Sequence, residues 1–200
     1  MIAGSAKPNR LKWLLPILIG WFVTIIGGFG VLAKYQFTSG AGATAPAAVA
    51  ALAGAKPELI VFLHPQCPCS RASVTELSRI TSKVGDRLKT TVYVYAPKEK
   101  PKDWVESGLF KQASAIPGVV VNQDPEGAAA RRYGVRTSGQ VLLYSSAGKL
   151  LFSGGITDSR GHEGDNDGED AIVRFALYNQ APRPVTPVFG CSLGTFSDTH

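Results

Sequence analysis

The sequence predicts an α/β fold, a mixed β-sheet flanked by helices, preceded by one N-terminal transmembrane helix. Three observations predict this class. An uncharged apolar run fills positions 13–33, strand-like and helix-like segments alternate after it, and a hairpin pattern precedes a last helix. Strands that alternate with helices are typical of layered α/β domains, and a closing hairpin makes the sheet mixed.

We predict five consecutive regions along the chain. They are a cytoplasmic N-terminus at 1–12, a transmembrane anchor at 13–33, a flexible tether at 34–56, a folded domain at 57–180 and a C-terminal tail at 181–200. Ala, Gly, Ser, Thr and Pro dominate the tether, a composition that packs poorly. A short Ala-rich helix near 46–55 is the alternative for that region.

The run from 13 to 33 is long enough to cross a membrane. As a helix it would extend roughly 31 Å at about 1.5 Å per residue, close to the thickness of a bilayer's hydrocarbon core. Lys7, Arg10 and Lys12 precede it, and only Lys34 follows closely. Because positive charge favours the cytoplasmic side, we predict a single-pass protein with its C-terminal domain on the other side of the membrane. A signal peptide cleaved among the small residues 39–43 is the alternative.

The formal net charge of +6 belongs to the membrane segment and not to the domain. Basic residues without any acidic residue occupy the chain before Glu58, and the two kinds are nearly balanced from there on. A nucleic-acid-binding domain needs a concentrated basic surface. We therefore expect no nucleic-acid partner.

Five short segments have strand character. The run Leu59–Leu63 is continuously apolar, as in a strand covered on both faces, and Val92 and Val94 alternate with tyrosines in the next segment. Ser145–Gly148 has the composition of a hairpin turn. The predicted strands are 59–63, 91–95, 119–121, 141–144 and 149–152.

Helical character is found in four segments, predicted at 70–84, 103–113, 125–133 and 168–178. Ser70 can cap the first of these helices. Pro125 would stand in the first turn of the third helix, where proline is tolerated. Either Asp165 or Asp167 can cap the last helix.

Cys67-Pro68-Cys69 stands between the first strand and the first helix of the domain. The helix dipole favours the thiolate, which is the form that attacks a disulfide. We therefore predict Cys67 and Cys69 as catalytic residues, with their sulfur atoms exposed at the mouth of the domain. A disulfide between them would close a small, strained ring and be comparatively oxidising. An inert disulfide or two buried thiols is the alternative.

Residues 57–180 resemble the thioredoxin-like superfamily, including the membrane-tethered thioredoxin-like proteins of bacterial envelopes. The resemblance is carried by the strand that leads into Cys67-Pro68-Cys69, by Tyr133–Arg136 before the hairpin and by Gly148 at its turn. Three strings are similar to bacterial proteins labelled RedB-like, namely His64–Ser70, Ser159–Asn166 and Thr186–Cys191. The resemblance implies a single-pass protein of the bacterial inner membrane with its C-terminal domain in the periplasm. It also implies a thiol-disulfide oxidoreductase that acts on protein thiols and disulfides of the cell envelope, with Cys67 attacking and Cys69 resolving.

Two positions depart from the pattern of that superfamily. Pro68 alone separates the cysteines, where the usual active site has two intervening residues. Gly139 stands where the superfamily has a cis-proline, which normally helps to seat the substrate backbone and is thought to discourage metal binding. These departures keep a second function open.

That second function is the binding of copper or another soft metal, as in a metallochaperone or assembly factor. Cys67, Cys69 and His64 form a soft ligand set suited to Cu(I) or Zn, which Cys191 and His162 could complete. Cys191 is alternatively a resolving thiol, a partner in an intermolecular disulfide or a buried small residue. His162 is alternatively an ordinary loop residue, since its loop lacks the spacing of an EF-hand.

Overall fold

The computed structural model describes residues 10–180 and 183–194. The predicted cytoplasmic residues 1–9 and the tail residues 181–182 and 195–200 lie outside the described residues. The chain divides into two units, Met1–Phe37 and Thr38–His200, each described by itself.

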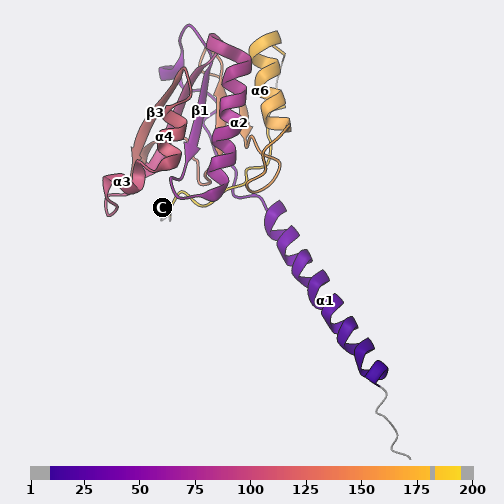
Figure 1. The fold of residues 1–200 in the computed structure, drawn as a ribbon. Coiled ribbons are helices and arrows are strands. Elements are labelled where there is room, and N and C mark those ends of the chain that lie inside the picture. Colours follow the sequence, from indigo (N-terminus) through magenta and orange to yellow (C-terminus); the bar gives the residue numbers. More distant parts are fainter. Residues whose placement is uncertain (1–9, 181–182, 195–200) are drawn as a thin grey trace, which may run out of the picture. The chain divides into compact units, whose positions relative to one another are not determined.

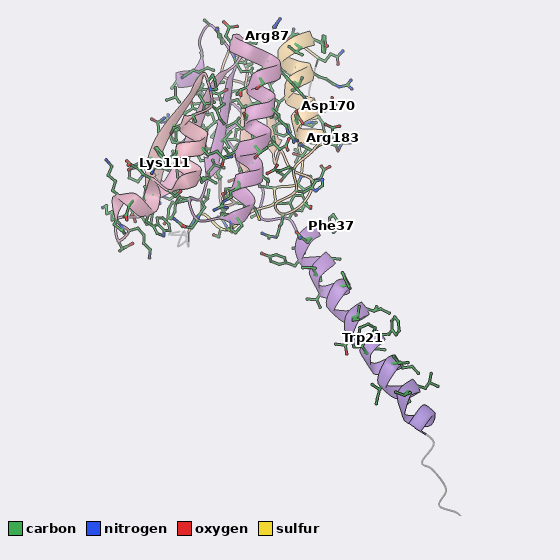
Figure 2. The ribbon with its side chains drawn as sticks, viewed as in Figure 1. Trp21, Phe37, Arg87, Lys111, Asp170 and Arg183 are labelled. Carbon is green, nitrogen blue, oxygen red and sulfur yellow. The ribbon has the colours of Figure 1, made fainter. Side chains whose placement is uncertain are left out.

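The first unit is a single helix, α1 (Arg10–Phe37). By length and composition, the stretch Leu14–Phe37 is apolar enough to cross a membrane. Figure 2 shows side chains along it, Trp21 and Phe37 among them, projecting outward from the helix. Trp21 is 58% and Phe37 70% exposed within this structure.

The second unit contains one five-stranded mixed sheet in the order β3-β2-β1-β4-β5 (Figure 1). The strands are β1 (Glu58–Leu63), β2 (Lys89–Ala96), β3 (Val119–Pro125), β4 (Gln140–Tyr144) and β5 (Leu150–Gly154). β1, β2 and β3 run parallel, whereas β4 is antiparallel to β1 and forms a hairpin with β5. The mixed sheet predicted from the sequence is confirmed.

One face of the sheet is covered by helices α2 (Pro68–Val84), α4 (Gly108–Ser114) and α6 (Asp167–Tyr178). Side chains alternate across a strand, so Leu59, Val61 and Leu63 all point to this face. The apolar side of α2 meets them through residues such as Leu77 and Ile80, which are fully buried. Figure 1 shows α2 lying between α4 and α6 in front of the strands.

The opposite face is covered by less regular structure. Ile60 and Phe62 of β1 pack there with Tyr133 and Val135, which follow the short helix α5 (Ala128–Arg132). Phe62 stacks on Tyr93 with ring centroids 5.5 Å apart. Residues 43–52 and Leu193 complete this second core.

Residues 38–56 differ from the flexible tether predicted for 34–56. They lie along the second face, where Thr44 N–H donates to the Gly134 carbonyl over 3.0 Å and Val49 N–H donates to the Gly148 carbonyl over 2.8 Å. A helical turn, η1, covers only Ala50–Leu52. Glycines on both sides allow the close approach: a Cβ at Gly40 would overlap the Thr137 side chain, and a Cβ at Gly134 would overlap Thr44.

Three helix boundaries also differ from the predictions. The segment 103–113 forms two helices, α3 (Lys102–Val105) and α4. Pro125 ends strand β3, and so α5 begins only at Ala128. Asn166, and neither neighbouring aspartate, caps α6 by accepting from the Glu169 N–H over 2.8 Å.

The described part of the C-terminal tail packs against the domain. Ser153 N–H at strand β5 donates to the Pro184 carbonyl over 2.9 Å, and Gly155 N–H donates to the Pro187 carbonyl over 3.1 Å. Further along, Leu193 N–H donates to the Arg136 carbonyl over 2.9 Å. The tail therefore runs from the end of β5 to the segment that precedes β4.

Candidate functional site

Cys67 lies where β1 ends and α2 begins. Its backbone is extended (φ −83°, ψ 119°) and occupies the N-cap of α2, with Pro68 as the first helical residue. Proline suits that position because the N–H it lacks would have no partner within the helix. The helix thus begins at Pro68 and not at Ser70, which puts Cys67 itself at the cap. This places the Cys67 sulfur at the positive end of the helix dipole.

Cys191 brings a second sulfur atom to Cys67 from the far end of the chain. The two Sγ atoms are 2.8 Å apart, and both residues are free thiols. Ser138 holds the backbone of Cys191 in place, because its N–H donates to the Cys191 carbonyl over 2.8 Å. A disulfide between Cys67 and Cys191 would need only a small approach of the two sulfurs.

The predicted exposure of the two sulfurs at the mouth of the domain is corrected by the structure. Cys67 is 3% exposed and Cys69 is 9% exposed. Both residues remain at the edge of α2, but the chain's own tail lies against Cys67 through Cys191. The two cysteines belong to neither apolar core.

Ser138 and Gly139 form the wall of the site on the side of β4. Gly139 has φ 87°, a left-handed conformation that favours glycine, and its N–H donates to the Phe62 carbonyl over 2.7 Å. The Ser138 Oγ accepts from the His64 N–H over 2.8 Å and lies 2.6 Å from the Ser70 Oγ. Ser138 therefore links the end of β1, the start of α2 and the tail. No local sequence signal identifies Ser138, although it directly precedes Gly139.

His64 shapes the turn that leads to Cys67. Its ring stacks on Tyr95 with centroids 5.8 Å apart and meets the edge of Trp104 at 5.5 Å. Its Nδ1 accepts from the Gln66 N–H over 3.2 Å, and its carbonyl accepts from the Cys67 N–H over 3.1 Å. Burial lowers the pKa of His64, which favours a neutral ring.

The loop predicted to bring His162 to the site contributes Arg160 instead. His162 is exposed, and its backbone N–H donates to the Ser159 carbonyl over 3.3 Å. Arg160 Nη1 donates to the Gly190 carbonyl over 2.9 Å, and the guanidinium also forms a hydrogen bond with Cys69. No local sequence signal identifies Arg160, because its partners lie far away in the chain.

Comparisons with known proteins find relatives by structure alone. No protein-family model and no curated protein matches the chain. A hypothetical protein from Sinorhizobium meliloti 1021 is similar at a TM-score of 0.59 and 18% identity, covering 79% of this chain and 93% of the other. An uncharacterized conserved protein from Geobacillus kaustophilus gives a TM-score of 0.58 and 16% identity, covering 79% and 92%. The exposed lipoprotein thioredoxin of Streptococcus pneumoniae gives 0.43 and 20%, covering 62% and 85%.

The sheet order and the position of the cysteines decide the fold class. β1 lies between a parallel and an antiparallel neighbour, and it leads directly into the cysteine pair at the start of α2. The fold is thioredoxin-like. Identities of this size show the fold of the thioredoxin-like domain and leave its chemistry to be argued from the site.

Electrostatics make Cys67 the most acidic thiol of the thioredoxin-like domain. Burial opposes its ionisation, but hydrogen bonds from the side chain and backbone of Cys191, and from Ser70, outweigh burial and lower the pKa of Cys67. Burial and the neighbouring charge of Cys67 raise the pKa of Cys69, an effect that Arg160 opposes. Burial, and then the hydrogen bond to Cys67, raise the pKa of Cys191 to about 12. These shifts favour the thiolate at Cys67 and the protonated thiol at Cys191.

The residues predicted as an alternative metal site do not form a ligand group. Across residues 10–180 and 183–194, no three His, Cys, Asp or Glu side chains are arranged to hold a metal ion. His64 in particular directs its Nδ1 to the Gln66 N–H. Of the predicted ligands, the sulfurs of Cys67 and Cys191 lie in contact, and thiolates are ligands that Cu(I) accepts.

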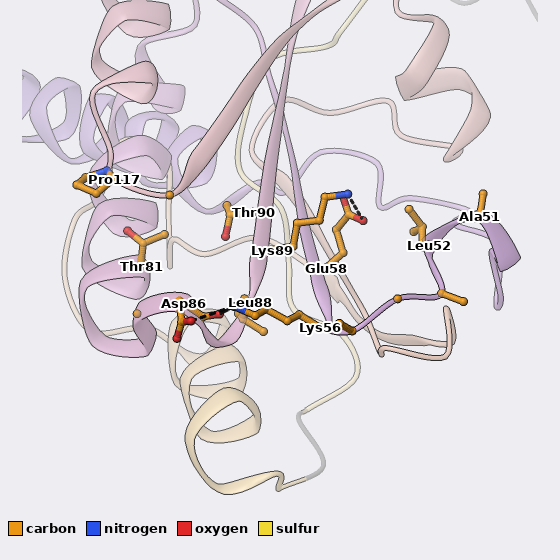
Figure 3. Close-up of a pocket in the computed structure, with 15 residues that line it drawn as sticks. Ala51, Leu52, Lys56, Glu58, Thr81, Asp86, Leu88, Lys89, Thr90 and Pro117 are labelled. Atoms are coloured by element: carbon orange, nitrogen blue, oxygen red, sulfur yellow. Dashed lines mark hydrogen bonds and ion pairs between the residues drawn. The ribbon is translucent and has the colours of Figure 1, made fainter.

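Two hollows of the thioredoxin-like domain lie at opposite ends of β1. A cavity of about 270 Å³ opens beside Cys67, between the start of α2 and the start of α4, with Arg71 and Leu109 in its wall. Another, of about 490 Å³, lies at the opposite end, where the Glu58–Lys89 ion pair lines it (Figure 3). Only the first of these two contains a predicted site residue.

Proposed function

We propose that the protein is a thiol-disulfide oxidoreductase of the cell envelope in which Cys67 is the nucleophile. The observation that carries this is the 2.8 Å separation between the Cys67 and Cys191 sulfurs at the N-terminus of α2. A thiolate with a lowered pKa and a second thiol within bonding reach are the two parts that disulfide exchange requires.

The exchange takes two steps. The Cys67 thiolate attacks one sulfur of a substrate disulfide, so that a Cys67–substrate disulfide forms and the second substrate sulfur leaves as a thiolate. A second thiol of the protein passes its proton to the departing substrate thiolate and then attacks Cys67 as a thiolate, which releases the first substrate sulfur and leaves an intramolecular disulfide. Two electrons pass from the protein to the substrate, whose other thiolate takes up a proton from water. The same steps in reverse oxidise a substrate dithiol.

The geometry favours Cys191 as the second thiol over Cys69, which the sequence suggested. Cys191 already meets Cys67 sulfur to sulfur. Cys69 is separated from Cys67 only by Pro68, so a disulfide between them would close a strained ring. In this proposal Cys69 stays a thiol beside Arg160.

The proposed location is the outer side of the bacterial inner membrane, with α1 as a single-pass anchor. The support is the apolar stretch Leu14–Phe37 together with the basic residues that precede it in the sequence. The three strings similar to RedB-like proteins support a place among membrane-tethered proteins of that kind. Alkaline extraction of membranes, with the mass of the mature chain, distinguishes an anchor from a cleaved signal peptide.

Trapping of mixed disulfides in membranes tests the function. Cells that express the full chain as Cys191→Ser, Cys69→Ser or Cys67→Ser are quenched with acid, alkylated and separated without reductant. The Cys191→Ser chain should accumulate Cys67-linked adducts with envelope proteins, because the resolving thiol is absent. The Cys67→Ser chain should accumulate none.

Each other outcome changes the proposal in a defined way. Adducts that accumulate mainly with Cys69→Ser would make Cys69 the resolving thiol. Adducts of equal amount with Cys67→Ser would contradict the function. Stoichiometric copper that co-purifies only when Cys67 is present, without adducts, would replace it with the metal-binding alternative.

A further inference from the structure

We propose that tail residues 188–193 occupy the edge at which the substrate's backbone binds. It follows that the substrate is an extended protein segment with glycine directly before its cysteine. This inference rests on the proposed function and names the substrate class of the same site.

The tail binds to the segment before β4 as an added strand would. Cys191 and Leu193 exchange backbone hydrogen bonds with Ser138 and Arg136, at 2.8 and 2.9 Å, and Ser192 forms an antiparallel bridge with Thr137. Peptides that add to an exposed sheet edge are held by main-chain hydrogen bonds, which form with many different side chains on the peptide. The edge formed by Arg136–Ser138 is thus built to hold an extended segment beside Cys67.

An external cysteine must take the place of Cys191 to react. The Cα atoms of two disulfide-bonded cysteines lie about 4.4–6.8 Å apart, so the incoming backbone has to pass close to Cys67. Cys191 already occupies such a position, with its sulfur 2.8 Å from that of Cys67. The tail and a substrate therefore occupy the edge in turn: the substrate binds there while the Cys67–substrate disulfide forms, and the tail returns with Cys191 to resolve that disulfide. The tail segment thus shows which residues the edge can hold.

Gly190 shows why a glycine is required before the cysteine. A Cβ at position 190 would overlap the carbonyl oxygen of Ser138, which is backbone and cannot rotate away. Arg160 also binds this residue, because its Nη1 donates to the Gly190 carbonyl over 2.9 Å. A substrate bound in the same register meets the same restriction.

Apolar residues anchor the segment on both sides of the cysteine. Phe189 is 6% exposed and Leu193 is 1% exposed, and Leu193 joins the second core of the domain. The pattern that the edge accepts is therefore an apolar residue, glycine, cysteine, any residue and an apolar residue. Each buried anchor adds to affinity in proportion to the apolar area removed from water.

The test uses the full chain in detergent with Cys69→Ser and Cys191→Ser, which leaves Cys67 as the one remaining cysteine of three. The probes are the peptides Val-Phe-Gly-Cys-Ser-Leu-Gly and Val-Phe-Ala-Cys-Ser-Leu-Gly, each joined through its cysteine to thionitrobenzoate. The Cys67 thiolate attacks the peptide sulfur, the bond to thionitrobenzoate breaks, and the coloured thiolate leaves. Its absorbance gives the rate.

The glycine peptide should react at least about tenfold faster than the alanine peptide, since overpacking against backbone costs enough for such a ratio. Adding Gly190→Ala should displace the tail from the edge and raise the rate at which Cys67 reacts with the glycine peptide severalfold. Gly42→Ala is the matched control, because a Cβ at that glycine meets nothing within 4 Å. Leu193→Ser, which loosens the tail without touching Gly190, should act in the same direction as Gly190→Ala.

Two outcomes would overturn the inference, and they are distinguishable. Equal rates for the two peptides, while Cys67 reacts with free dithiobis-nitrobenzoate, would remove the substrate class and leave the proposed function in place. Failure of Cys67 to react with either peptide or with the free reagent, in the variants with a loosened tail, would remove both.

Discussion

At Cys67, hydrogen bonds decide the ionisation of the thiol against the effect of burial. The donors are the side chain and backbone of Cys191 together with Ser70. Because they stabilise the thiolate, the pKa of Cys67 lies below its ordinary value of 9.0. We predict that alkylation of Cys67 by iodoacetamide, followed by mass spectrometry across pH, has its midpoint below that value.

Removal of the sulfhydryl donor should reverse this shift. In Cys191→Ala the midpoint for Cys67 should move to higher pH, since the side-chain hydrogen bond is lost while burial by the remaining chain still opposes ionisation. Ser192→Ala is the control and should leave the midpoint in place, because the Ser192 hydroxyl donates to the Gly194 carbonyl over 3.0 Å. An unchanged midpoint in Cys191→Ala would mean that the helix end alone sets the acidity of Cys67.

At the scale of elements, the stability of α6 depends on one side chain at its start. Asn166 is 8% exposed, and its Oδ1 accepts from the Glu169 N–H over 2.8 Å. Loss of such a cap costs about 1 kcal/mol of unfolding free energy. We predict this loss for Asn166→Ala, measured by urea denaturation of the full chain in detergent. Asp165→Ala is the matched control, because Asp165 is exposed beside it, and an equal loss there would contradict the assignment of the cap.

At the scale of the whole molecule, the choice of disulfide partner has a measurable effect on stability. Cys67 and Cys191 are 124 positions apart, so their disulfide would restrict most of the unfolded chain and stabilise the domain by about 4–5 kcal/mol. A Cys67–Cys69 disulfide closes a very small loop and would contribute only about 1–2 kcal/mol. We predict that denaturant unfolding gives oxidised wild type a free energy of unfolding about 4–5 kcal/mol above that of reduced wild type.

The cysteine variants separate the two pairings. The difference in unfolding free energy between oxidised and reduced protein should persist in Cys69→Ser and disappear in Cys191→Ser. The opposite pattern would show that the sequence-based pairing of Cys67 with Cys69 holds and that the tail only covers the site. Either result also reports whether oxidation fastens the tail to the domain.

Much of the fold could be predicted from local patterns. Three patterns depend only on residues close together in the chain. They are the continuous apolar run of β1, the hairpin turn before Lys149 and the helical spacing of Val74, Leu77 and Ile80. The helix start beside Cys67 could be placed for the same reason, although the cap itself is one turn earlier than Ser70 suggested. Boundaries such as Pro125 were missed because strand pairing with Ala96 prevailed over a local helix signal.

The apolar stretch, the α/β order and a cysteine pair at the start of a helix follow from the sequence, since each depends on neighbours along the chain. The surroundings of the cysteine pair depend on the three-dimensional fold, because Cys191 lies against Cys67, Ser138 against Ser70 and Arg160 acts on Cys69, each from a distant segment. It also decided what the small residues of 38–56 and Gly190 do. A glycine that permits close approach cannot be told from one that permits flexibility until the opposing backbone is in place.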